Sequence, residues 1–342
     1  MRLTVASFFS GIGGLDLGFD RAGFDISVQC EIDPFCRFIL TKHWPQVPKF
    51  SNIKEMDDAD VPFSSIWTGG FPCQDVSLAR MGPRSGLKGK KSGLFYEFVR
   101  LAREGRPRVI LIENVPGLLS SHGGRDFGIV IRTLADLGYG VGWRVLNSRY
   151  FGVPQSRQRV YIIACYRDRR GAAKILFEPK RSSRNAAAGK SNGKTVVSPF
   201  KKSLGNPRKG PIVQALAYCL YACSARHTGT DWSRNYVIYP PEKVRRLMPI
   251  ECERLQGFPE NWTLPENPTV DPERLDSLRY NAIGNAVTVP VAEVLAKRIA
   301  SYVSTQRQLP ASPETVGEDV DRALAEIAHQ ESVLQTFAAQ QG

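Results

Sequence analysis

The 342-residue sequence lacks any apolar run close to the ~20 residues that a membrane-spanning helix needs. It also lacks an N-terminal segment in which basic, apolar and small-residue parts follow one another as in a secretory signal. Its seven cysteines form no CxxC pair, and their odd number is typical of free thiols in a reducing compartment. These absences exclude the membrane, secreted and disulfide-stapled classes, and we expect a cytoplasmic protein without membrane association.

Acidic residues are scarce in one quarter of the chain. Between Cys165 and Ile250 there are 18 Lys and Arg residues against 4 Asp and Glu, so this segment accounts for the whole net charge of +13. A solvated surface segment would explain scattered lysines, but a block of one sign between near-neutral flanks favours a face that binds a polyanion. Charge alone does not distinguish DNA from RNA or from an acidic protein.

Short apolar runs alternate with helical patterns over the first 165 residues, which predicts a doubly wound α/β domain of Rossmann-like type. Strands are expected at 3–9, 26–30, 65–68, 109–112 and 161–165, and helices at 15–22, at 35–42 and from Pro249 to Gly257. The length predicts about two domains. We place the first at 1–165, completed by about 266–303, a smaller mixed domain at 166–265, and a linker with a tail helix at 304–342.

A glycine turn follows the first strand, in the order Phe9-Ser10-Gly11-Ile12-Gly13-Gly14. Glycines there let the backbone approach a ligand beside a helix N-terminus. The turn departs from the GxGxxG pattern because the sixth position is Asp16. Glu31 ends the second strand, where a carboxylate typically receives a ribose diol. The two features indicate an adenosine-containing cofactor, either NAD or S-adenosylmethionine.

Two reactive side chains are predicted at the edge where open α/β sheets bind ligands. Cys73 lies between Pro72 and Gln74, beyond the carboxyl end of a strand, and the next strand delivers Glu113 to the same edge. A free cysteine is usually a small buried hydrophobe, and a carboxylate here could cap local amides. Their shared position makes them candidates for a nucleophile and a proton donor.

Two further clusters involve arginine and sulfur. Gln155, Arg157 and Arg159 alternate along an extended stretch and are expected to face one side, where the guanidiniums could bind phosphate or offset Glu113. The cluster Cys219, Cys223 and His227 has the i, i+4, i+8 spacing of one helix face. Three ligands make a poor zinc site, so we expect a buried helix face and no metal.

In chain order, these and other segments resemble the motifs of the DNA cytosine-5 methyltransferases over roughly residues 3–300. The matching segments are FSGIGG at 9–14, Glu31, GGFPCQ at 69–74, SGLF at 92–95, ENV at 113–115, QSRQR at 155–159, RLQGFP at 254–259 and IGNAV at 283–287. The resemblance implies a methyltransferase domain with a target-recognition domain at 166–265, S-adenosylmethionine as cofactor and double-stranded DNA as partner.

The resemblance also implies roles for single residues. Cys73 would be the nucleophile and Glu113 the acid that contacts the target cytosine, while Arg157 and Arg159 would hold the base and Asn114 the loop. The cofactor would contact Phe9, Gly11, Gly13, Glu31, Ile32, Asn52, Ile53, Pro72, Leu94, Asn285 and Ala286. DNA would contact Gln74, Ser77, Arg80, Arg84, Arg226 and Arg234. Asn52 replaces the Asp that the family often has, and Ala286 replaces its Ser.

The implied chemistry explains these residue types. Carbon 5 of cytosine is a poor nucleophile, but addition of a thiolate to carbon 6, with a proton at ring nitrogen 3, makes carbon 5 enamine-like. Cys73 would supply the thiolate, favoured by nearby arginine charge, and Glu113 the proton. Because these atoms are inaccessible in a duplex, the base must be flipped out. The basic loop Ser77–Lys91 resembles the segment that closes over DNA in this family.

We expect a monomer that belongs to a restriction-modification system, with a separately acting cognate endonuclease, or that is an orphan modification enzyme. Three alternatives stay open. A tRNA cytosine methyltransferase would carry a Cys-Phe-Thr tripeptide, which the sequence lacks. A catalytically silent DNA-binding regulator would not need both Cys73 and Glu113. An NAD dehydrogenase would explain the glycine turn but not the Pro72-Cys73-Gln74 segment.

Overall fold

The computed structural model describes residues 3–72, 93–177, 203–204, 212–214, 216–220, 236–239, 243–266 and 268–308. The predicted nucleophile Cys73, the predicted DNA contacts, the basic loop Ser77–Lys91 and the tail helix lie outside these residues. By its contacts the chain divides into residues 1–300 and 301–342, and the part of the second unit that is described, 301–308, is the end of a helix.

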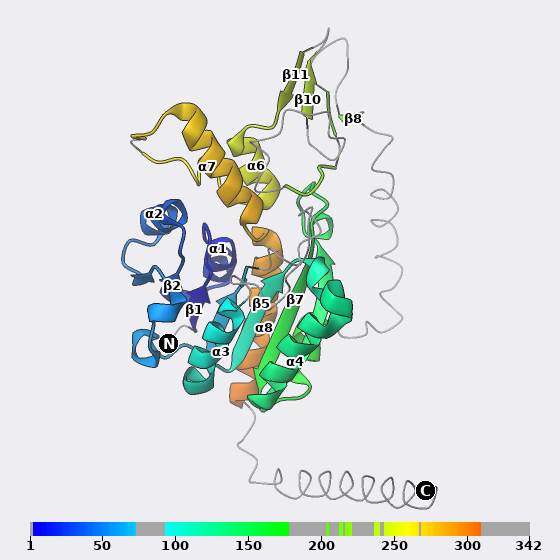
Figure 1. Cartoon of the computed structure of the whole chain (residues 1–342). Helices are drawn as coiled ribbons and strands as arrows, with labels where there is room; N and C mark the ends of the chain where they lie inside the picture. The colour runs from blue at the N-terminus through cyan, green and yellow to red at the C-terminus, as the bar shows by residue number, and fades with distance from the viewer. Residues whose placement is uncertain are drawn as a thin grey trace, which may run out of the picture. The chain divides into compact units, whose positions relative to one another are not determined.

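A seven-stranded sheet with the order β3-β2-β1-β4-β5-β7-β6 forms the centre of the first unit (Figure 1). Its strands are β1 (Thr4–Phe8), β2 (Asp25–Cys30), β3 (Lys49–Phe50), β4 (Ile66–Gly69), β5 (Val109–Asn114), β6 (Tyr139–Asn147) and β7 (Gln158–Tyr166). The strands β1 to β5 pair in parallel, whereas β7 is antiparallel to both β5 and β6. The predicted doubly wound α/β class is confirmed, and each strand expected in the first 165 residues is present with slightly shifted ends.

The strand order reverses beside β1. The strands β2 and β3 lie on one side of it, and β4 and β5 lie on the other. The loops that follow β1 and β4 therefore leave in opposite directions and open a crevice at the carboxyl ends of these strands. Ligands of open α/β sheets bind at such a point.

Helices pack on both faces of the sheet (Figure 1). The described α-helices are α1 (Gly14–Arg21), α2 (Pro34–His43), α3 (Leu94–Gly105), α4 (Arg125–Asp136), α5 (Gly171–Leu176), α6 (Pro249–Gln256), α7 (Pro272–Asn285) and α8 (Val289–Gln308). Of these, α6 and α7 lie beyond the strand ends and not on a face of the sheet (Figure 1). On the α3 face, Phe8 packs against Trp67 and Phe98 with ring centroids 5.0 and 5.3 Å apart. On the other face, α1 lies so close to α8 that a Cβ on Gly18 would come within 2.5 Å of the Ala292 side chain. These contacts fix the strand ends that carry the site.

The chain between β7 and α6 forms a second, four-stranded antiparallel sheet with the order β11-β10-β9-β8. Its strands are β8 (Ser203–Leu204), β9 (Ile212–Gln214), β10 (Tyr236–Tyr239) and β11 (Lys243–Arg246). Arg245 of β11 donates to both carboxylate oxygens of Glu251 in α6, at 2.7 and 2.9 Å. The helix α6 begins at Pro249 and ends at Gly257 (φ 79°), as predicted. Among the described helices, none combines the length and the apolar composition that crossing a membrane requires.

Candidate active site

A cavity of about 1050 Å³ opens at the carboxyl ends of β1, β2, β4 and β5, at the point where the strand order reverses. Nine of the eleven residues predicted to bind the cofactor line it: Phe9, Gly11, Glu31, Ile32, Asn52, Ile53, Pro72, Leu94 and Asn285. Glu113, Arg157 and Arg159 line the same cavity. The structure therefore brings the predicted cofactor residues and the described catalytic candidates together.

The other two predicted cofactor residues lie behind the cavity wall. Gly13 has a left-handed backbone (φ 81°), and a Cβ there would come within 2.5 Å of the Trp44 ring. Ala286 is buried, and its carbonyl accepts a hydrogen bond from Arg157. Both residues support the wall, and their contact with a cofactor stays a prediction.

Glu31 and Gly11 form a cradle at the end of β1 and β2. The Gly11 N–H donates to Glu31 Oε2 at 2.7 Å, and the Asp33 N–H donates to Oε1 at 2.8 Å. Burial raises the pKa of Glu31, and the amides of Asp33, Gly11 and Ile32 act in the opposite direction. Each oxygen accepts one bond from the chain and keeps a lone pair, because a carboxylate oxygen accepts two. The carboxylate can therefore accept two ribose hydroxyls.

One part of the cavity wall is apolar. Ile32 is 68% exposed, although it lines a cavity that also includes Phe9, Ile53 and Leu94. Asn52 is engaged locally, because its Nδ2 donates to Glu55 Oε1 at 2.8 Å and its Oδ1 accepts from Lys54 N at 3.2 Å, which leaves one N–H and one lone pair of the amide for a ligand. Asn52, at the position where the family often has Asp, thus caps the start of a 3₁₀ turn.

Glu113 pairs with Arg159 across two antiparallel strands. In the β5–β7 register Glu113 lies opposite Tyr161, so Arg159 is its diagonal neighbour. Arg159 Nε lies 3.1 Å from Glu113 Oε1, and the two side chains are 14% and 11% exposed. Burial lowers the pKa of Arg159, but the Glu113 carboxylate together with Cys219 and Tyr161 acts in the opposite direction, and the net effect raises the pKa of Arg159. The carboxylate thus has a fixed cationic partner at the cavity.

The Arg157 side chain is buried and donates hydrogen bonds to backbone carbonyls of the protein. Its Nη2 donates to the carbonyls of Ala286 and Gly284 at 2.8 and 3.1 Å, and its Nη1 donates to Leu220 O at 2.9 Å. Burial and the neighbouring Arg159 lower the pKa of Arg157. These bonds support a positioning role for Arg157 rather than contact with a base.

Cys219 is a residue of the site that sequence reasoning did not identify. It accepts hydrogen bonds at Sγ from Arg157 (3.4 Å) and Arg159 (3.9 Å), and it lines the cavity. The predicted helix through Cys219 is wrong in the described part, because 216–220 is not helical and Ala217 forms an isolated β-bridge with Gln155. Cys223 and His227 lie outside the described residues.

The expectation that Gln155, Arg157 and Arg159 face one side is confirmed, because each contacts the segment Cys219–Leu220. Gln155 is fully buried, accepts from Leu220 N at 3.1 Å and donates to Leu255 O at 2.9 Å. It therefore connects the segment that precedes β7 to Leu220 and to α6.

Asn114 supports the loop that leads to Cys73. Its Nδ2 donates to the Phe71 carbonyl at 3.2 Å, and its Oδ1 accepts from Val115 N at 2.8 Å. Pro72, which precedes Cys73 in the sequence, lines the cavity.

Among the described residues, no group of three or more His, Cys, Asp or Glu side chains is arranged to hold a metal ion.

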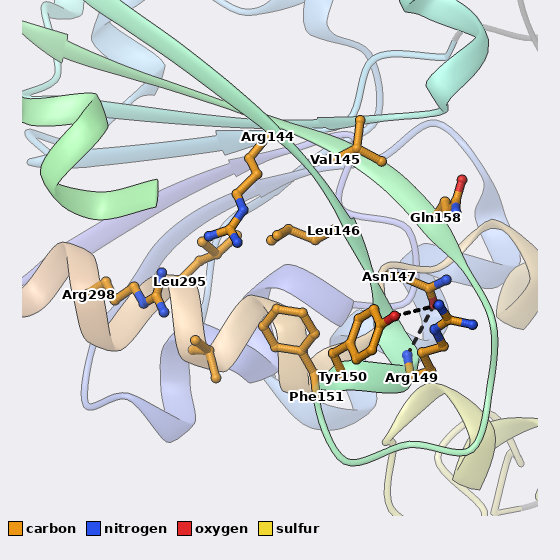
Figure 2. A pocket seen from close by; sticks show the side chains of 11 residues that line it. Arg144, Val145, Leu146, Asn147, Arg149, Tyr150, Phe151, Gln158, Leu295 and Arg298 are labelled. Carbon is orange, nitrogen blue, oxygen red and sulfur yellow. Dashed lines mark hydrogen bonds between the residues drawn. The ribbon is translucent and has the colours of Figure 1, made fainter. Parts of the chain in front are cut away.

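A second cavity of about 700 Å³ lies between the end of β6 and α8 (Figure 2). Arg144 and Arg298 line it, but both donate to the Leu176 carbonyl at the end of α5. Arg149 stacks on the Tyr150 ring, 4.6 Å from its centroid, and bonds its hydroxyl. None of the described residues lining it is acidic or a thiol, so the chemistry belongs to the larger cavity.

Comparison with known proteins gives one consistent result. The family model described as "C-5 cytosine-specific DNA methylase" matches residues 3–203 and 182–301. The type II methyltransferase M.MthTI of Methanothermobacter thermautotrophicus is 31% identical over 332 residues, covering 87% of this chain and 97% of that one. M.NgoBI of Neisseria gonorrhoeae is 32% identical over 310 residues, covering 84% and 90%.

Among solved structures, the Entamoeba histolytica methyltransferase EhMeth matches with a TM-score of 0.62 and 17% identity, covering 90% of this chain and all of that one. The S. pombe Dnmt2 methyltransferase matches with a TM-score of 0.62 and 18% identity, covering 89% and 99%. At this identity the two structures support the fold.

Proposed function

This chain belongs to the C-5 cytosine-specific DNA methylase family, and from that premise we propose how its own residues carry out the reaction and which DNA it acts on. The protein is an S-adenosylmethionine-dependent DNA (cytosine-5-)-methyltransferase. The observation that carries the finer proposal is one cavity that combines the Glu31–Gly11 cradle with the Glu113–Arg159 pair.

The cofactor fits the part of the cavity next to β1 and β2. The free lone pairs of Glu31 would accept the ribose hydroxyls, and the exposed Ile32 would lie against the adenine ring. Phe9, Gly11, Asn52, Ile53, Pro72, Leu94 and Asn285 form the remaining wall. When bound, S-adenosylmethionine supplies an electrophilic methyl group.

The cytosine is activated by side chains on the other side of the cavity. Cys73 adds as a thiolate to carbon 6, and Glu113 protonates or hydrogen-bonds ring nitrogen 3, so that carbon 5 becomes nucleophilic. Arg159 fixes the Glu113 carboxylate and contacts the base, while Arg157 holds Gly284, Ala286 and Leu220 in place around it. The base reaches these groups by flipping out of the duplex.

The basic segment supplies the DNA contacts in this proposal. The second sheet, β8 to β11, belongs to the target-recognition domain at 166–265, and Arg226 and Arg234 contact DNA together with Gln74, Ser77, Arg80 and Arg84. The enzyme acts as a monomer on a defined sequence. Because M.MthTI and M.NgoBI are type II methyltransferases, we place this chain in a restriction-modification system with a separate endonuclease.

Expression in a bacterial host without cytosine methylation tests this proposal. Bisulfite sequencing of the host DNA should show methylated cytosines within a single short motif, and purified protein with S-adenosylmethionine should reproduce that motif on a plasmid. A Cys73→Ala variant is the matched control and should leave the DNA unmodified. Methylation scattered without a motif would contradict sequence specificity, and absence of methylation with the unaltered protein would contradict the activity.

A further inference from the structure

Asp16 is the residue that breaks the GxGxxG pattern, and its carboxylate is hydrogen-bonded to two strands of the sheet. The side chain is fully buried on α1 and points to the sheet. Its Oδ2 accepts from the Ser7 hydroxyl of β1 at 3.0 Å, and its Oδ1 accepts from Gln29 Nε2 of β2 at 2.8 Å. The charged group that faces it is Lys49 of β3, whose Nζ donates to the Trp44 and Val47 carbonyls.

Ser7 connects Asp16 to the cofactor loop. The hydroxyls of Ser7 and Ser10 lie 2.9 Å apart. A hydroxyl has one proton to donate, and that of Ser7 goes to Asp16, so in the bond between the two hydroxyls Ser10 is the donor. The next residue is Gly11, whose N–H binds Glu31 at 2.7 Å. An ionised Asp16 therefore fixes the direction of donation along a chain of bonds that ends beside the Glu31 cradle.

We propose that Asp16 is a positioning residue for the cofactor: through Ser7 and Ser10, its carboxylate holds the Ser10-Gly11 backbone in the geometry that binds Glu31 and S-adenosylmethionine. This inference rests on the proposed cofactor site. It explains why a carboxylate occupies a position at which a small residue would suffice for close packing of helix and strand.

Loss of the Asp16 charge reverses the bond chain. A neutral Asp16 donates to Ser7, Ser7 then donates to Ser10, and the Ser10 hydroxyl turns to the Ser7 or Cys30 carbonyl, 3.1 and 3.4 Å away. Gln29 Oε1, which is buried without a partner, offers the protonated carboxyl a second acceptor. Burial raises the pKa of Asp16 to about 6, so this reversal occurs within the range of pH in which the enzyme can be assayed. Affinity for the cofactor should fall as pH falls through that value.

The test is calorimetric binding of S-adenosylhomocysteine to the full-length protein between pH 5 and pH 8. For the unaltered protein we expect affinity to fall about tenfold between pH 7 and pH 5, the equivalent of one lost hydrogen bond. Asp16→Asn should bind about tenfold more weakly at pH 7 and lose this pH-dependent component. Ser7→Ala interrupts the chain of hydrogen bonds while Asp16 stays in place. This variant should also lose the pH-dependent component of the affinity. Glu31 also titrates in this cavity, but it is present in every variant and so does not affect the difference.

Asp126→Asn is the matched control. Asp126 is a buried acid that accepts from Ser121 and does not line the cofactor cavity. It should bind with unaltered affinity and pH profile. The inference is overturned if folded Asp16→Asn and Ser7→Ala keep the affinity and pH profile of the unaltered protein, or if Asp126→Asn weakens binding as much as they do. An unaltered protein that binds no S-adenosylhomocysteine at pH 7 would instead overturn the proposed cofactor site.

Discussion

Arg159 Nε lies 3.1 Å from Glu113 Oε1, so the proposed acid of the reaction is held by a cation from the neighbouring antiparallel strand. The pair is shielded from solvent at the cavity that contains the cofactor cradle. This ion pair holds one oxygen of the Glu113 carboxylate beside Arg159. Removal of either partner leaves the other as a buried charge without compensation.

We therefore predict that the pair is strongly coupled. Arg159→Ala and Glu113→Gln should each lower the free energy of unfolding, by about 3–5 kcal/mol for the variant that leaves Glu113 unpaired. The double variant should lose less than the sum, because it leaves no unpaired charge. Urea unfolding of the unaltered protein, the two single variants and the double variant measures this coupling. Additive losses of unfolding free energy would show that the two residues are not energetically coupled. Methyl transfer by folded Glu113→Gln should be about 10²–10⁴-fold slower.

Arg157→Lys distinguishes a positioning role from contact with a base. Lysine cannot serve three carbonyls on two sides, so Gly284, Ala286 or Leu220 would lose a donor. We expect the free energy of unfolding to fall by about 1–3 kcal/mol for each buried carbonyl left without a partner. Arg254→Lys, at an ion pair whose arginine is 56% exposed, should change it by less than about 0.5 kcal/mol. A stable Arg157→Lys protein with slow methyl transfer would favour contact with the base.

The sequence predicted those parts of the site that depend on strand ends. The carboxyl ends of parallel strands meet at one edge, so the positions of Glu31 and Glu113 follow from the apolar runs that precede them. The pairing of Arg159 with Glu113 does not follow, because it depends on β7 entering the sheet antiparallel to β5. Nor does the contact of Cys219 with Arg157, which joins residues 62 positions apart. Local patterns contain no information on such contacts.

Glu31→Ala should weaken binding of S-adenosylhomocysteine about 10–100-fold, because hydrogen bonds to a charged group are worth about 1.5–3 kcal/mol. Loss of the carboxylate also frees the Gly11 and Asp33 amides that it holds. Glu31→Gln keeps one acceptor oxygen and should have an intermediate effect. Glu97→Ala, on α3 and outside the cavity, is the control in the same calorimetric measurement. Unchanged affinity in Glu31→Ala would remove Glu31 from the site.

Asp16→Asn should stabilise the fold while it weakens cofactor binding. Burial raises the pKa of Asp16 from 3.8 to about 6, so the folded state holds this proton more tightly than the unfolded chain does. Stability is therefore lost as pH rises from about 4 to 6, and above pH 6 the ionised form costs on the order of 3 kcal/mol. Asparagine avoids this cost. Urea unfolding should show that Asp16→Asn is more stable than the unaltered protein at pH 7 and equally stable at pH 3. Equal stability of the two proteins at both pH values would contradict the cost assigned to ionised Asp16.

Cys73 should form a covalent bond to carbon 6 of the target cytosine, and fluorine at carbon 5 should trap it. After the methyl group reaches carbon 5, the hydrogen there must leave as a proton before the thiolate can depart. Fluorine cannot leave as a cation, so no base can complete the elimination. With S-adenosylmethionine, the enzyme should therefore stay bonded to DNA that contains 5-fluorocytosine at the target, and the complex should survive denaturing electrophoresis.

Variants of the cysteines decide which sulfur forms this bond. Cys73→Ala should abolish the adduct, whereas Cys30→Ala, Cys165→Ala and Cys252→Ala should form it wherever they fold, because those three thiols are buried. Cys219→Ser is the demanding control, since Cys219 lines the same cavity and contacts both arginines. It should still form the adduct, more slowly if its sulfur orients Arg159. If Cys73→Ala retains the adduct and Cys219→Ser loses it, the nucleophile is Cys219 and the central assignment of the mechanism is wrong.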